Sequence, residues 1–195
     1  MSILPKHKYL LTYRYSEIIH DLTVEFCQRF LVGHLSYLGD LGQIPKRRTI
    51  DQMVQAARSG KQNIVEGVGQ SRTSKKGEIK LLGVAEASLE ELITDYEDFL
   101  RQRKFAVWPK THPKIQAFRK RAAFLTDLGN LSDLGDLREK PKLPEDQETA
   151  ANLLLTLCHM ATYLLSRQIT KAEDDFVKTG GYTENLFKKR LGARI

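Results

Sequence analysis

Four long segments of the chain repeat apolar residues at alternating steps of three and four. In the third of them Leu82, Leu89 and Tyr96 fall on one stripe, and in the last Leu154, Leu157 and Ala161 do. Such spacing places apolar side chains on one face of an α-helix. No segment alternates with a period of two for long enough to predict a strand. The four predicted helices span about residues 16–31, 49–66, 74–103 and 147–176.

Glycine and proline mark where we expect these helices to end. The expected breaks are Gly33, Gly39, Gly42 and Pro45, then Gly67 and Gly69, then Pro109 and Pro113, and finally Gly180 and Gly181. Residues 114–125 predict a further short helix, and residues 177–195 a basic, amphipathic helical extension. The pattern therefore predicts an all-α, up-down four-helix bundle, a single domain over residues 1–195, with a long connection between the third and fourth helices.

The composition is that of a soluble globular protein, with 41% hydrophobic and 28% charged residues. Cys27 and Cys158 lie inside apolar runs, as buried thiols of a reducing compartment do. The longest apolar run, Ala150 to Leu165, is short for a bilayer span and is interrupted by Asn, Thr and His. The start of the chain lacks the apolar region of a signal peptide. We therefore expect a cytoplasmic protein.

The stretch Gln55 to Gln70, QAARSGKQNIVEGVGQ, contains three glycines and two cations. A phosphate-binding loop of the GxxxxGK[ST] type would need glycine at Gln55 and a hydroxyl at Gln62, and neither is present. A dinucleotide fingerprint would need a third glycine at Arg72. A helix in which small residues allow close packing accounts for more of the pattern. Glu66, near the end of that helix, is expected either to have a partner such as Arg58 or Asn63, or to be solvated.

Two segments resemble a known family. ARSGKQNIVEG, with Arg58, Asn63 and Glu66, and LGVAEASLEEL, with Glu91, resemble motifs of the four-helix-bundle proteins first noticed in intervening sequences of bacterial 23S ribosomal RNA genes. Ala87 stands where that family often has glycine, and Gly60 and Lys61 replace its usual small pair. The tail GGYTENLFKKRLGAR further resembles the four-helix-bundle suffix subfamily.

This resemblance implies a homo-oligomer, a homopentamer with a central pore. It also implies a relation to the accessory variability protein of diversity-generating retroelements, which binds nucleic acid and a reverse transcriptase. A reverse transcriptase or another protein is therefore an expected partner class. We expect Arg58, Asn63, Glu66 and Glu91 to form a structural polar network between the second and third helices.

The net charge of +7 is concentrated in one segment, Phe99 to Thr126, which holds eight basic and no acidic residues. Phe105, Trp108 and Phe118 interleave with these cations, so stacking on unpaired bases is one interpretation. In the other, the aromatic residues cap the bundle and the cations face water. We predict RNA or DNA binding with low sequence specificity. The predicted contacts are Arg101, Arg103, Lys104, Arg119, Lys120 and Arg121, with Lys75 and Lys76 as further contacts.

Catalytic patterns are absent from the sequence. The five histidines show no metal-ligand spacing, and no Gly-x-Ser-x-Gly elbow occurs. We therefore predict a non-enzymatic protein without a cofactor or a metal. The alternative to nucleic-acid binding is a homo-oligomeric scaffold or adaptor, in which the acidic second half of the third helix or the basic tail docks on a neighbour.

Overall fold

The computed structural model describes residues 4–32 and 43–193, and of residues 43–46 it describes only the backbone. These residues form an all-helical protein, in which the isolated antiparallel bridge Leu131–Leu137 is the one strand-like pairing. The α-helices are α1 Leu11–Phe26, α2 Gln43–Gln70, α3 Lys75–Gln102, α4 Pro113–Leu125, α5 Gln147–Thr179 and α6 Tyr182–Gly192. A 3₁₀ turn, Lys6–Tyr9, precedes α1, and a π-helical segment, Cys27–Val32, continues it.

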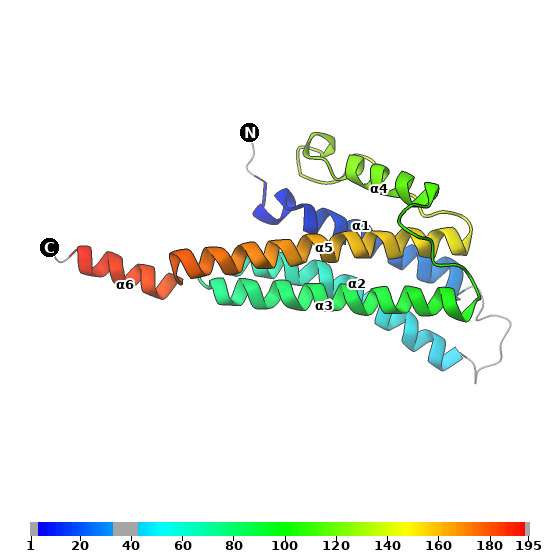
Figure 1. Ribbon diagram of the computed structural model, residues 1–195, viewed down its shortest axis with the longest axis horizontal. Coiled ribbons are helices and arrows are strands. Elements are labelled where there is room, and N and C mark those ends of the chain that lie inside the picture. Colours follow the sequence, from blue (N-terminus) through cyan, green and yellow to red (C-terminus); the bar gives the residue numbers. More distant parts are fainter. Residues whose placement is uncertain (1–3, 33–42, 194–195) are drawn as a thin grey trace.

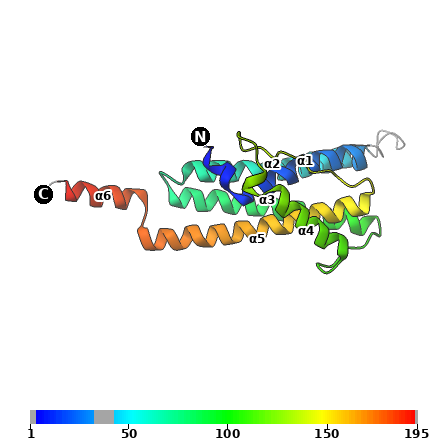
Figure 2. The same ribbon diagram turned by 90° about the horizontal axis from the view of Figure 1, so that it is seen from above.

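Helices α1, α2, α3 and α5 lie side by side along the long axis of the molecule (Figures 1 and 2). Helix α1 contacts α2 and α5, and α3 contacts the same two helices, so each has two neighbours. Helix α4 lies outside this group and packs on α5. Helix α6 extends beyond the end of α5, away from the rest of the protein.

The apolar stripes predicted from the sequence form the core between these helices. Ile19 and Leu22 of α1, Leu89 of α3 and Leu154 of α5 are all buried. Phe26 makes edge-to-face contacts with Phe30, Tyr96 and Phe99, and the fully buried Tyr96 donates a hydrogen bond to Thr23 Oγ1 at 2.9 Å. The aromatic contacts and this satisfied hydroxyl join α1 to α3 near the end of the core.

Two glycines of α2 are contact points with α3. A Cβ at Gly60 would lie 2.9 Å from Leu89 Cδ2, and one at Gly67 would lie 3.4 Å from the Glu78 carbonyl oxygen. Gly67 and Gly69 do not end the helix, as the sequence had predicted, because α2 continues through both to Gln70. This continuous helix also places no strand before Gly60, so the region lacks the strand-to-loop geometry of a nucleotide-binding motif.

The ends of the helices match the prediction best where a capping residue is present. Ser74 accepts a hydrogen bond from the Gly77 N–H at the start of α3, and Asp146 accepts one from the Thr149 N–H at the start of α5. Gly180 ends α5 with φ +72°. Pro45 lies inside α2, and the other breaks expected before it, Gly33, Gly39 and Gly42, lie outside the described residues.

Helix α1 begins at Leu11, five residues before the expected start. Its first turns bury polar side chains, among them Thr12 and Arg14, so the apolar pattern does not show there. Arg14 donates hydrogen bonds to the carbonyl oxygens of Thr126 and Lys8. The buried guanidinium therefore ties α1 to the segment that follows α4.

Among the described residues, one helical segment, Gln147–Gly192, is long and apolar enough to cross a membrane by length and composition. Of the apolar window in this segment, 61% is buried inside the protein. The core helix of a soluble protein passes the same test, and α5 forms one side of the core here.

We predict that alanine at Gly60 is less stable than alanine at Gly69 by about 1–3 kcal/mol, the usual cost of overpacking a core. Both positions lie in α2, but an added Cβ meets Leu89 at Gly60 and nothing within 4 Å at Gly69. Gly69→Ala alone should gain up to ~1 kcal/mol, since glycine is a poor helix former. Urea unfolding of both variants measures the difference, and equal stabilities would show that the α2–α3 contact is not tight.

Candidate nucleic-acid interface

The basic residues at the end of α3 have separate surroundings. Arg101 forms an ion pair with Asp98 at 2.7 Å, and both side chains are largely exposed. The Arg103 guanidinium lies 3.8 Å from the centre of the Phe99 ring, and its desolvation lowers its pKa. Lys104 is exposed and has φ +58°, in the left-handed region. Of the three, Arg101 is therefore neutralised locally and Arg103 is partly covered.

The three consecutive cations of α4 point in different directions, since successive residues of a helix are rotated by about 100°. Arg119 lines a groove between α4 and α5. Arg121 lies on the other side of α4 and forms an ion pair with Glu139. Lys120 is exposed between them.

Lys75 and Lys76 start α3 and thus lie at its far end from Arg101, ~40 Å away at 1.5 Å per residue. Lys75 forms an ion pair with Glu78. The predicted contacts are thus spread over several surfaces, and Asp98, Glu139 and Glu78 neutralise three of them. The basic segment is continuous in the sequence, but it does not form one continuous patch in the structure.

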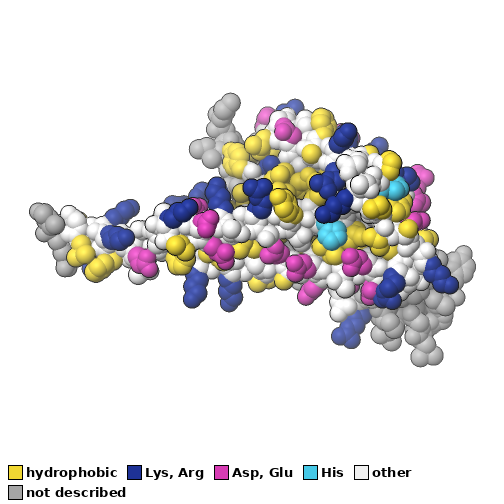
Figure 3. Space-filling model, in the orientation of Figure 1, with side chains coloured by type: hydrophobic (Ala, Val, Ile, Leu, Met, Phe, Trp, Pro, Cys, Tyr) yellow, Lys and Arg dark blue, Asp and Glu magenta, His cyan; other side chains and the backbone are white. Residues whose placement is uncertain are grey.

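A groove of about 590 Å³ brings together part of the basic segment and the outer face of α5. We call it the α4–α5 groove. Its face of the protein shows apolar side chains bordered by Lys and Arg (Figure 3). The groove is lined by Leu11, Tyr15, Val107, Trp108, Pro109, Lys110, Ile115, Arg119, Asn152, Leu155, Thr156, His159, Met160, Tyr163 and Leu164.

The wall of the groove is held by Asn152, a polar residue of α5 that is only 1% exposed. Its side-chain oxygen accepts a hydrogen bond from the Trp108 N–H at 2.8 Å, and its amide donates to the carbonyl oxygens of Ala106 and Glu148. The Glu148 carboxylate accepts from the Ala106 N–H and from the Trp108 indole. These bonds fix the connection between α3 and α4 against α5.

The aromatic residues predicted to stack on bases are largely used by the fold. Phe105 and Phe118 pack against the core, and Trp108 is stacked on His112 with ring centres 4.3 Å apart. The exposed ring in the groove is Tyr163, which is 61% exposed and has Arg167 beside it. The sequence analysis missed Tyr163, because it belongs to a helix about 40 residues beyond the basic segment.

Lys110 and Arg119 are the cations that reach the groove, and neither forms an ion pair with a described residue. Burial lowers the pKa of His159, with Lys110 acting in the same direction and Glu97 opposing it. His159 is therefore a neutral imidazole at pH 7, and the positive charge of the groove comes from its lysine and arginine.

The expected polar network between α2 and α3 is centred on serines. Asn63 donates to the Ser59 carbonyl oxygen and hydroxyl, and the Ser59 and Ser88 hydroxyls lie 2.9 Å apart. Arg58, Glu66 and Glu91 are exposed and form no hydrogen bond or ion pair with a described residue. For Glu66 this is the solvated alternative.

No group of three or more His, Cys, Asp or Glu side chains in residues 4–32 and 43–193 is placed to hold a metal ion. Comparison of the chain with protein-family models, with curated proteins and with solved structures finds no match.

We predict that Asn152→Ala lowers the free energy of unfolding by about 1–3 kcal/mol, because the buried Trp108 N–H loses its acceptor. Trp108 is the only tryptophan in the chain, so its fluorescence reports directly on this site. The emission should shift to longer wavelength as the connection loosens. Asn63→Ala, which removes only bonds within α2, is the matched control and should leave the emission unchanged.

We predict that stability falls as the pH drops from 7 through 6.5, the ordinary pKa of histidine. The pKa values of His159 and His7 are lowered in the folded protein, so the unfolded chain takes up protons first. His159→Gln should reduce this dependence, and His7 should account for part of what remains. Thermal unfolding between pH 5.5 and 8 measures it, and an unchanged slope in the variant would contradict the burial of His159.

Proposed function

We propose that the protein is a non-enzymatic accessory protein that binds RNA or DNA in the α4–α5 groove, with low sequence specificity. One observation carries this proposal: two cations without an ion-pair partner, Lys110 and Arg119, border an apolar groove in which the ring of Tyr163 is exposed. A basic groove with an exposed aromatic ring is typical of sites that bind single-stranded nucleic acid.

The chemistry of the groove favours contacts with the backbone and with base faces. Lys110, Arg119 and the nearby Arg167 would neutralise phosphates, and a base would stack on Tyr163. Reading a base edge would need free polar groups. The Asn152 amide, the best placed for this, is already occupied by Ala106, Trp108 and Glu148. Low sequence specificity follows from this.

We further propose that α1, α2, α3 and α5 form an up-down four-helix bundle, that the protein is cytoplasmic, and that it self-associates, as a homopentamer by the resemblance to the intervening-sequence proteins. The mutual contacts of these four helices support the bundle, and the burial of α5 in the core supports a soluble protein. A ring of copies would multiply the grooves. A reverse transcriptase remains the partner that the resemblance favours.

The alternative function is a homo-oligomeric scaffold or adaptor without nucleic-acid binding. It is favoured by α6, none of whose residues is buried in the single chain. Light scattering measures the mass and fluorescence anisotropy measures nucleic-acid binding. An oligomer without any anisotropy change would select this alternative.

We predict that Lys110→Ala with Arg119→Ala weakens binding of a labelled single-stranded oligonucleotide by about tenfold or more at low salt. It should also reduce the slope of log K against log salt by about 2, one unit for each lost phosphate contact. Tyr163→Ala should weaken binding by ~1–3 kcal/mol without changing that slope, because stacking releases no counterions.

The matched control is Lys171→Ala with Lys178→Ala, which removes the same charge from exposed positions near the far end of α5. If the control weakens binding as much as the groove variant, binding depends on net charge and not on this groove. If the wild-type protein gives no signal with RNA or DNA, the nucleic-acid proposal is excluded.

A further inference from the structure

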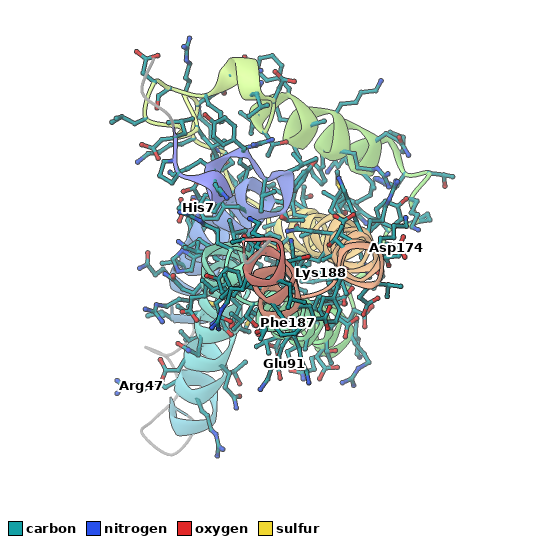
Figure 4. The ribbon with its side chains drawn as sticks, turned by 90° about the vertical axis from the view of Figure 1, so that its left-hand side faces the viewer. His7, Arg47, Glu91, Asp174, Phe187 and Lys188 are labelled. Atoms are coloured by element: carbon teal, nitrogen blue, oxygen red, sulfur yellow. The ribbon has the colours of Figure 1, made fainter. Side chains whose placement is uncertain are left out.

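Helix α6 has an apolar face that nothing in the chain covers. Tyr182, Leu186, Phe187 and Leu191 are 43–62% exposed, although they make up more than a third of an 11-residue helix. Viewed from this end, α6 lies in front of the rest of the protein, with Phe187 and Lys188 on it (Figure 4). An isolated helix shorter than ~12–15 residues is marginal in water. Helix α6 therefore needs a surface to pack on.

The charge of α6 limits which surface that is. Lys188, Lys189 and Arg190 are consecutive and exposed, and none forms an ion pair with a described residue. The α4–α5 groove has an apolar lining, but its own Lys110 and Arg119 would repel these cations. An acidic surface would be complementary.

Such a surface exists between α2 and α3, and we call it the α2–α3 groove. It has a volume of about 720 Å³ and a floor of small side chains, Ala56, Ser59 and Ser88. Asp51, Glu91 and Asp95 line it with a single cation, Arg48, and none of the three carboxylates has an ion-pair partner among the described residues. Desolvation, together with repulsion from Asp98 and Glu91, raises the pKa of Asp95. A cation in this groove would relieve that repulsion.

The α6 of the same chain does not reach this groove. The end of α5 lies beyond the start of α3 at the same end of the molecule (Figure 1). Folded back at Gly180 and Gly181, α6 would span ~16 Å. Glu91 lies 16 residues into α3, ~24 Å from its start, and Asp51 lies farther still along the groove. The occupant must therefore come from another molecule.

We infer that α6 of one copy docks in the α2–α3 groove of a second copy. Its apolar side chains then cover the small residues of the floor, and its cations face Glu91 and Asp95. The inference rests on the self-association proposed above but not on nucleic-acid binding. Because each copy has one α6 and one groove, the contact is head-to-tail, and it closes into a ring or continues as an open chain.

The first test is charge exchange, read as mass against concentration by light scattering. Lys188→Glu with Lys189→Glu should weaken self-association by about tenfold or more, since like charges then face each other. Glu91→Lys with Asp95→Lys should do the same, and the four changes combined should restore assembly. Glu173→Lys with Asp174→Lys, on the exposed face of α5, is the control and should have no effect. A monomeric wild-type protein, or no restoration in the combined variant, would overturn the inference.

The second test is cross-linking between two variants. Glu91→Cys and Lys188→Cys proteins, one carrying a size tag, are mixed under a mild oxidant and run on a non-reducing gel. The native Cys27 and Cys158 are buried and should not compete. A mixed dimer is expected for this pair but not when Glu173→Cys replaces Glu91→Cys. Assembly without this cross-link would place the interface elsewhere and overturn the inference.

A third measurement separates the other possible occupant of α6, an anionic membrane surface. The full chain is sedimented with vesicles of phosphatidylserine and phosphatidylcholine. If Lys188→Glu with Lys189→Glu abolishes vesicle binding but leaves the mass unchanged, α6 is a membrane contact and the inference fails. The oligonucleotide affinity of these variants is measured in parallel, so that loss of assembly and loss of nucleic-acid binding are recorded independently.

Discussion

An amphipathic helix that leaves its apolar stripe in water forgoes about 25 cal/mol for each Å² it could bury, and this constraint organises the protein. Helices α1, α2, α3 and α5 satisfy it by covering one another. Gly60 allows α2 to approach Leu89 closely, and the aromatic residues around Phe26 fill the space between α1 and α3. Helix α4 covers its stripe on the outside of α5. Helix α6 alone among the described α-helices buries no residue.

The groove that we propose to bind nucleic acid is a consequence of how α4 is held. A connection that crosses the surface of α5 must satisfy its backbone polar groups, and Asn152 and Glu148 do so for Ala106 and Trp108. Their bonds keep α4 on α5 and leave a hollow between them. Lys110 and Arg119 thus lie beside Tyr163, although more than 40 residues separate them along the chain.

Charge illustrates the difference between sequence and structure. The segment Phe99 to Thr126 is purely basic, yet Asp98 and Glu139, just outside it, neutralise Arg101 and Arg121. Rotation along α4 then sends Arg119 and Arg121 to opposite sides. Complementary charge appears instead between distant elements, in the cations of α6 and the carboxylates of the α2–α3 groove. Those two surfaces cannot meet within one chain, because α6 is too short.

The sequence by itself determined the all-helical class and most of the helix boundaries, because apolar spacing and capping residues such as Ser74, Asp146 and Gly180 act locally. It failed at the start of α1, where the buried Arg14 breaks the apolar pattern, and at Gly67, where a glycine serves a contact instead of a helix end. Only the tertiary structure decided which cations share a surface, that Tyr163 faces them and that α6 stays uncovered. These properties depend on distances between helices and on their rotation, which local spacing does not encode.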